Sequence, residues 1–458
     1  MWGAGSESRM HSELLIEQAR VKAKKPAEER NQKGPQQRPY IDELDQMRAI
    51  TIFCMVAVHV LIYTAFLAPD PLGTQIFNGV YNALRFTRTI FMFITAAALV
   101  STYYGKPFSF ISFWKKRSIG VLLPYLIWTI IYTAINEPQP SRWAFLITTL
   151  KNVLTGNDSI QLYYIVLTLQ FYLLLPGFLW LLQRAKRHPW TLLGVSFALQ
   201  VILWTVDYYT LEAHIPSTGF FALVAHYQYR FVLLYQFYFV LGGVVALHLS
   251  EVRAWLLSHR TWVFVALGVT LTARTLVYVF QFDVAHLPID YTVEVLQPVM
   301  VFYSVSVIAF LYWLTYRSVR KRDPQRPSRG RRFWRTLSDA SFRVYLVHPI
   351  VMGLVFICVI FPLRSWAPGL ICIVLTWLLT AFGSTVWSLL FMNLPILSRL
   401  VGRSHRKLDQ ALPVGWLKRR VARRNPAIKT APVKAPSRVH LNAPSLQQSA
   451  GATPKRIH

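Results

Sequence analysis

Two ionisable residues share one face of the first long apolar segment of the chain. Arg48 and His59 are eleven residues apart, which in an α-helix is roughly 20° past three full turns and a separation of ~16 Å along the axis. Apolar surroundings favour the neutral imidazole, which is the form that accepts a proton as a general base. A histidine that only donates its ring N–H to a neighbouring helix is the alternative interpretation, and both stay open.

A compact basic cluster precedes the third apolar segment. It consists of Lys115, Lys116 and Arg117. Ammonium and guanidinium groups at the mouth of a cavity bind phosphates through charge-assisted hydrogen bonds, so the cluster suits the capture of a nucleotide-like donor. Charge that only marks the cytoplasmic side of a membrane is the plainer explanation. The position of the cluster leaves both interpretations open.

A third polar group lies in the ninth apolar segment. Arg343, Tyr345 and His348 precede Pro349. The proline frees a backbone carbonyl one turn earlier and usually kinks the helix. These side chains would place polar groups in the inner half of a helical bundle, either as part of a site or as a hydrogen-bonded structural kink.

Ten apolar runs are each about long enough to cross a bilayer, which takes ~20 helical residues. None contains Asp or Glu, as the cost of burying a carboxylate predicts. Two shorter runs, Trp143–Leu154 and Phe220–Tyr229, are predicted as interfacial helices or loops. The expected fold is all-α, a polytopic transmembrane helical bundle of about ten spans. The runs cover residues 47–67, 86–103, 119–136, 162–182, 190–206, 231–249, 262–282, 295–316, 340–361 and 369–391.

The basic residues alternate between the two sides of this bundle. If the amino terminus is cytoplasmic, 40 of the 49 Lys and Arg residues fall on the cytoplasmic side and five fall on the opposite side. Short cytoplasmic loops are enriched in Lys and Arg. Both termini are therefore expected to be cytoplasmic, and the protein is expected in the plasma or inner membrane as a multi-pass protein.

The composition fits a membrane protein better than a soluble one. Of 458 residues, 54% are hydrophobic and 15% are charged, whereas soluble domains have ~25% charged residues. The net charge of +29 is explained by the excess of Lys and Arg on the cytoplasmic side, so nucleic acid is not an expected partner. The three cysteines, Cys54, Cys358 and Cys372, lie in apolar runs, so neither a disulfide framework nor a metal site is expected.

The side opposite the termini is slightly acidic and rich in aromatic residues. Carboxylates beside aromatic rings suit a polyhydroxylated ligand, but the interfacial belt of membrane proteins has the same composition and is the favoured interpretation. The residues concerned include Asp158, Tyr163, Tyr164, Glu212, Tyr229, Asp290 and Glu294.

Three regions follow from these patterns. Residues 1–40 are a basic amino-terminal tail, 41–395 are the membrane domain, and 396–458 are a basic carboxy-terminal tail. Both tails are rich in Lys, Arg, Pro, Gln and Ser without a sustained apolar period, which predicts disorder along most of their length.

Three separated motifs resemble those of the acyltransferase-3 family, whose members acylate cell-surface carbohydrates. The resemblance covers about residues 40–395. The chain departs from the family pattern at Thr95-Ala96, where Ser-Gly is usual, and at Gly120, where a second arginine is usual. The motifs are Leu44-Asp45-x-x-Arg48-Ala49 with His59, Lys116-Arg117 leading into Leu123-Pro124-Tyr125-Leu126, and Ser341-x-x-x-Tyr345-Leu346-x-His348-Pro349.

The resemblance implies transfer of an acyl group, commonly acetyl, from cytoplasmic acyl-CoA to a hydroxyl of a glycan or glycolipid. It assigns catalytic roles to His59, as the base, and to Arg48, which would hold or polarise the donor, and it assigns the CoA phosphates to the cluster Lys115–Arg117. Membrane lipids, a carbohydrate or glycolipid acceptor and glycan-synthesis proteins are the implied partners, with no metal. Further pocket candidates are Asp45, Arg88, Tyr164, Arg343, Tyr345 and His348.

Two other functions remain as alternatives. A transporter of a polysaccharide or lipid-linked sugar would share this architecture, although such proteins often show inverted repeats and none is visible in the sequence. A structural subunit that positions glycan-synthesis enzymes would leave Arg48 and His59 dispensable.

Overall fold

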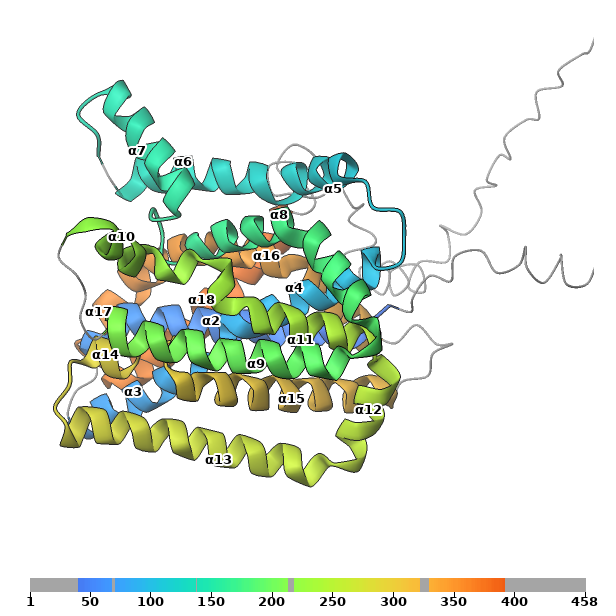
Figure 1. The fold of residues 1–458 in the computed structure, drawn as a ribbon. Helices are drawn as coiled ribbons and strands as arrows, with labels where there is room; N and C mark the ends of the chain where they lie inside the picture. Colours follow the sequence, from blue (N-terminus) through green and yellow to red (C-terminus); the bar gives the residue numbers. More distant parts are fainter. Residues whose placement is uncertain (1–39, 68–70, 137, 213–217, 322–328, 392–458) are drawn as a thin grey trace, which may run out of the picture. The chain divides into compact units, whose positions relative to one another are not determined.

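The computed structural model describes residues 40–67, 71–136, 138–212, 218–321 and 329–391, and these residues form helices without a strand (Figure 1). The all-α prediction is confirmed for this part of the chain. The longer helices are α2 (Asp42–Thr64), α3 (Pro71–Leu84), α4 (Thr87–Tyr103), α5 (Phe110–Arg117), α6 (Leu123–Asn136), α7 (Arg142–Thr155), α8 (Tyr163–Arg184), α9 (Pro189–Val206), α10 (Gly219–Tyr227), α11 (Gln236–Leu247), α12 (Leu249–Ser258), α13 (Arg260–Val279), α15 (Pro298–Arg320), α16 (Arg329–Val355) and α18 (Gly369–Phe391). Two short ones are α14 (Ile289–Thr292) and α17 (Phe361–Leu363).

Nine helical segments of the described residues are long and apolar enough to cross a membrane. A tenth results if Gly219–Arg230 and Val232–Leu247, which meet at a 42° bend, form one span. The ten predicted runs fall on these ten segments. Phe220–Tyr229, predicted as a separate interfacial element, lies in the first helix of this bent pair.

The second span is longer than its apolar run. Helix α3 extends it back to Gly73, in a segment that the sequence analysis did not predict as helical. Asn78, Asn82 and Gly79 dilute the apolar pattern there. The amide side chains of Asn78 and Asn82 are buried in the structure, so this part of the bundle is held by polar contacts as well as by apolar packing.

Helix α2 occupies the centre of the bundle and contacts α4, α15, α16 and α18 (Figure 1). Its first turn carries Asp42, Glu43 and Asp45, which interact favourably with the positive end of the helix dipole. Glu43 is 1% exposed, and one of its oxygens lies 2.7 Å from a guanidinium nitrogen of Arg253 on α12. This ion pair joins the start of α2 to the middle of α12, two helices that the sequence left unconnected.

Helices α4 and α11 approach each other closely through small residues. A Cβ atom at Gly242 would lie 2.3 Å from the carbonyl oxygen of Phe93 and 3.0 Å from Cβ of Ala96. Small residues at such contacts let membrane helices pack backbone to backbone. Ala96 therefore belongs to the helix contact, at one of the positions where the sequence departs from the family pattern.

Substituting Gly242 by alanine is expected to destabilise the bundle, because the added methyl group meets backbone atoms that cannot rotate away. Overpacking of this kind costs about 1–3 kcal/mol, and the thermal unfolding temperature of the purified protein in detergent reports it. Gly268→Ala on α13 is the matched control, since a Cβ there meets nothing within 4 Å. Equal melting temperatures for the two variants would contradict the packing argument.

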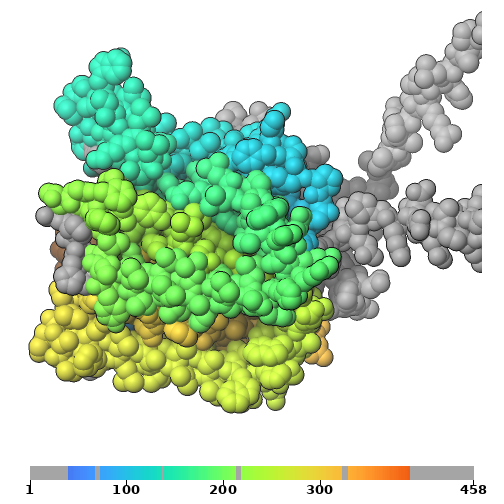
Figure 2. All heavy atoms as spheres, viewed as in Figure 1, coloured from blue at the N-terminus to red at the C-terminus, as the bar shows by residue number. Residues whose placement is uncertain are grey.

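Helix α7 stands out from the rest of the described surface (Figure 2). Ser141 caps its first turn by accepting a hydrogen bond from the backbone N–H of Ala144 at 3.1 Å, and Gly156 ends it in the left-handed conformation at φ 70°. Trp143 and Leu154 are 75% and 74% exposed. An exposed apolar helix outside the spans has the character predicted for an interfacial element. Nearly all of both basic tails lies outside the described residues.

Candidate functional site

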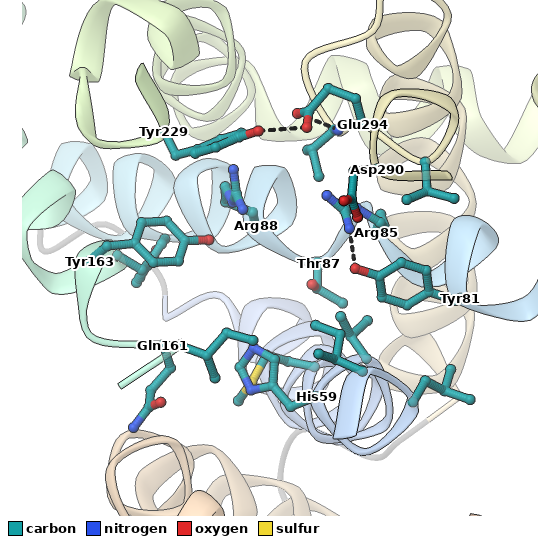
Figure 3. A pocket seen from close by; sticks show the side chains of 18 of the residues that line it. His59, Tyr81, Arg85, Thr87, Arg88, Gln161, Tyr163, Tyr229, Asp290 and Glu294 are labelled. Atoms are coloured by element: carbon teal, nitrogen blue, oxygen red, sulfur yellow. Dashed lines mark hydrogen bonds between the residues drawn. The ribbon is translucent and has the colours of Figure 1, made fainter. Parts of the chain in front are cut away.

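A cavity of ≈ 570 Å³ opens at one end of the bundle (Figure 3). Its walls come from the second half of α2, the junction of α3 and α4, the start of α8 and the segment 289–295. This volume lies within the range of ~300–1,000 Å³ typical of small-molecule sites. Polar and aromatic side chains that line it include His59, Asn78, Tyr81, Arg85, Thr87, Arg88, Gln161, Tyr163, Tyr164, Glu212, Tyr229, Asp290, Glu294 and Tyr345.

A pair of histidines lies at the base of this cavity. Nδ1 of His59 on α2 is 2.7 Å from Nε2 of His348 on α16, and the two rings lie nearly parallel, with centres 4.9 Å apart and an interplanar angle of 17°. His59 is 8% exposed and lines the cavity, whereas His348 is fully buried behind it. The first and third motifs of the sequence therefore meet through their histidines.

The hydrogen bonds of His348 determine the protonation of both neutral rings. Its Nδ1 lies 2.9 Å from the carbonyl oxygen of Tyr345 and 3.2 Å from that of Val344. Carbonyl oxygens only accept, so Nδ1 of His348 carries the hydrogen and its Nε2 is an acceptor. Nδ1–H of His59 must then donate to that nitrogen. Nε2 of His59 is left as the unprotonated, basic nitrogen of the ring that lines the cavity.

Pro349 contributes to this arrangement through the backbone. Because proline has no N–H, it makes no hydrogen bond to the carbonyl of the residue four positions earlier, which is Tyr345. That carbonyl is one of the two that accept from Nδ1 of His348. The proline, which the sequence predicted to free a backbone carbonyl, therefore supplies an acceptor that orients a functional side chain.

The wall opposite His59 in Figure 3 combines arginine, tyrosine and glutamate. The guanidinium of Arg88 lies 4.8 Å from the ring centre of Tyr163 and 5.2 Å from that of Tyr229. The Tyr229 hydroxyl donates to Glu294 at 2.5 Å. Tyr163, Tyr229 and Glu294 were expected in a membrane-interface belt, and they line the cavity together with Arg88, which was predicted as a pocket residue.

Arg48 does not line the cavity. It lies on the same helix as His59, and it donates to the Ser338 hydroxyl at 3.4 Å, while Ser338 donates to Asp45 at 2.7 Å. Both Arg48 and His59 thus contact α16, which confirms that they share one face of α2. Their separation along that face keeps Arg48 and Asp45 away from the histidine pair, so neither contacts a group that reacts there.

Arg343, predicted as a pocket residue, does not line this cavity. Its Nε donates to the Ser388 hydroxyl on α18 at 3.1 Å, and its NH2 donates to the carbonyl of Asp339 at 2.7 Å. Successive helical residues are 100° apart, so Arg343 points about 200° away from Tyr345. Tyr164 and Tyr345, which do line the cavity, have ring centres 6.0 Å apart.

Comparison with known proteins decides the family. A family model described as an acyltransferase domain matches residues 41–393. The chain belongs to the acyltransferase-3 family. It is 23% identical over 319 residues, 68% of its length and 81% of the relative's, to YfiQ of Bacillus subtilis (strain 168), whose own assignment as a membrane-bound acyltransferase is provisional. No solved structure matches the chain.

The basic motif of this acyltransferase-3 protein lies at a separate place from the cavity. Lys115 and Lys116 are exposed at the end of α5, whereas the guanidinium of Arg117 stacks over Phe113 at 5.4 Å and Tyr172 at 5.1 Å. A π-helical turn at Ser118–Leu122 follows directly.

Two donors in this basic segment are buried without a partner among the described residues. They are Nε of Arg117 and Nε1 of Trp114. Burying an unpaired donor is unfavourable, and the exposed ammonium groups of Lys115 and Lys116 beside these donors are accessible to a phosphate. The cluster therefore has the character of an anion site even though Gly120 stands where the family usually has arginine.

Proposed function

We propose that this acyltransferase-3 protein transfers an acyl group, most simply acetyl, from acyl-CoA to a hydroxyl of a cell-surface polysaccharide or glycolipid. The observation that carries the proposal is the His59–His348 pair, because its hydrogen bonds place a basic nitrogen on the wall of a cavity large enough for a sugar. A general base beside the acceptor hydroxyl is what an ester-forming acyl transfer requires.

The reaction follows from the protonation of the pair. The acceptor oxygen attacks the thioester carbonyl carbon while Nε2 of His59 removes the hydroxyl proton. The carbon–sulfur bond then breaks, and the CoA sulfur takes that proton back from Nε2. The products are an ester and free CoA. While His59 is cationic, its Nδ1–H donates to the neutral Nε2 of His348, a charge-assisted bond stronger than the neutral one.

The donor is proposed to bind through the basic cluster Lys115–Arg117, with Arg48 as a second donor-side cation. Both lie near segments that the charge pattern assigns to the cytoplasmic side, where acyl-CoA is found. Arg48 and His59 are separated by ~16 Å along α2, so the nucleotide end and the acyl end of an extended donor would occupy different parts of the bundle. Membrane lipids surround the spans, and glycan-synthesis proteins are the proposed partners.

Replacing Arg117 by alanine is expected to raise KM for acyl-CoA about tenfold or more, since one charge-assisted hydrogen bond contributes about 1.5–3 kcal/mol. The turnover number at saturating donor should stay near the wild-type value, as for an interaction made equally in the ground and transition states. Steady-state kinetics with varied acyl-CoA measures both. Lys151→Ala, an exposed lysine on α7, is the control. A fall in kcat that saturating donor does not restore would show that Arg117 is misassigned.

The function itself is tested in cells by replacing His59. Surface glycan from cells that express the wild-type protein should carry ester-linked acyl groups, detected as a mass increase that mild alkali removes. Cells that express His59→Gln at the same level should lack them. Unacylated glycan that accumulates inside cells only when the protein is deleted would instead favour the transporter.

A further inference from the structure

The guanidinium of Arg88 is held in the cavity without a carboxylate partner. Its recorded hydrogen bond goes to the Tyr235 hydroxyl at 2.7 Å, and rings of Tyr163, Tyr229 and Tyr235 surround it. Among the described residues no ion pair includes it. A guanidinium has five N–H donors, and a charge inside a membrane bundle is costly unless it is paired. Arg88 therefore has donors and charge available for a ligand.

A second arginine increases that positive charge. Arg85, three residues before Arg88, lines the same cavity and donates to the Tyr81 hydroxyl. Arg85 lies in the turn between α3 and α4 and Arg88 in the first turn of α4, and their like charges repel each other. Arg85 is also one of only five basic residues on the side opposite the termini in the predicted topology. Two arginines thus line one cavity although their charges repel each other and although basic residues are rare on this side. This indicates that the cavity receives an anion.

Two of the three carboxylates that line the cavity are engaged elsewhere. Glu294 accepts from the Tyr229 hydroxyl at 2.5 Å and from the backbone N–H groups of Val295 and Leu296 at 2.6 and 2.9 Å. It attracts Arg88 electrostatically without an ion pair. Glu212 accepts from the Gln228 amide at 2.6 Å. These contacts fix Glu212 and Glu294 on the wall. The third carboxylate, Asp290, is exposed and forms no ion pair with either arginine among the described residues, so neither arginine has a carboxylate partner.

We infer that Arg88, assisted by Arg85, binds an anionic group of the acceptor, a carboxylate or a phosphate, while a hydroxyl of the same molecule faces His59. This inference rests on the proposed function and names the acceptor class, an acidic rather than a neutral glycan unit. Arginine binds both groups with two parallel hydrogen bonds. Figure 3 shows Arg88 and His59 on opposite walls, so one sugar bridging them would present a hydroxyl away from its charged substituent.

Calorimetric binding to the purified full-length protein, without donor, tests the inference. Three probes are compared: a glucuronate tetrasaccharide, the same compound with its carboxyl groups reduced, and the reduced compound carrying one phosphate. The wild type should bind at least one anionic probe about tenfold or more tighter than the neutral one. Arg88→Gln should remove about 10- to 100-fold of that preference, since charged hydrogen bonds contribute about 1.5–3 kcal/mol, and leave neutral binding unchanged.

Further variants separate the possible outcomes. Arg88→Lys, which keeps a point charge, should retain more of the phosphate preference than of the carboxylate preference. Arg364→Gln is the matched control, because Arg364 also stacks on a ring, that of Phe361, but lies outside the cavity. If Arg88→Gln does not fold, the anion preferences of Arg85→Gln and Arg88→Lys test the inference in its place. Equal wild-type affinity for the three probes, no binding of any probe, or equal weakening of all three in Arg88→Gln would overturn the inference.

The anion preference measured in this experiment does not depend on whether the protein transfers an acyl group. His59→Gln should keep the anion preference of the wild type. A protein with that preference and no acyl transfer would refute the proposed function alone, whereas acyl transfer without any anion preference would refute the present inference alone.

Discussion

Replacing His59 by glutamine is expected to lower kcat by about 10²- to 10⁴-fold, the usual contribution of a positioned general base. Glutamine preserves polarity and approximate size, and its amide can still donate to Nε2 of His348, so the bundle should remain folded. No atom of the amide is basic enough to accept the hydroxyl proton. Turnover with saturating donor and acceptor measures the loss.

A second histidine provides the control for this prediction. His259 is exposed and stacks on Trp255 outside the cavity, so His259→Gln should keep wild-type turnover. His59→Gln with wild-type turnover would refute the base assignment. His59→Gln protein that aggregates during gel filtration would point to a structural role of the buried ring.

Replacing His348 by phenylalanine is expected to lower kcat by about 10- to 100-fold. The change leaves the buried Nδ1–H of His59 unpaired, which costs about 1–3 kcal/mol, and 1.4 kcal/mol corresponds to tenfold. The other tautomer of His59 is then lower in free energy. It carries its hydrogen on Nε2, so the cavity no longer has a basic nitrogen. KM for both substrates should change little, since the interaction acts in the transition state.

Replacing His348 by glutamine shows whether His348 acts by orienting His59 or only by filling space. In His348→Gln the amide oxygen can accept from Nδ1–H of His59 in place of the lost Nε2, so most of the activity should return. Phenylalanine fills the space without that acceptor. Equal activity of the two variants, whether high or low, would contradict the assignment of His348 as a positioning residue.

The sequence predicted individual groups of the site better than their contacts. His59, Tyr345 and His348 were singled out from their types and spacing, and the ten apolar runs correspond to ten helical segments. His59 meets His348 because α2 packs against α16, although the two histidines are almost three hundred positions apart in the sequence. Helical periodicity within one segment carries no information about which distant helix lies beside it.

Arg343 shows where spacing alone was insufficient. It shares a short motif with Tyr345 and His348, but two residues of a helix point in nearly opposite directions, and it contacts Ser388 instead. Tyr163, Tyr229 and Glu294 were noticed in the sequence and assigned to an interface belt. Composition does not distinguish a belt that faces lipid from a cavity wall, because both combine rings with polar groups near the membrane surface.

The central claim is that His59 moves a proton during acyl transfer to a glycan hydroxyl. The most direct measurement incubates the purified protein with acetyl-CoA labelled in the acetyl group and a surface-glycan extract from the source cells. Wild-type protein is predicted to move label into alkali-labile esters of the glycan and to release free CoA in equal amount, while His59→Gln does neither above background. Equal transfer by both proteins, or none by the wild type, would contradict the account.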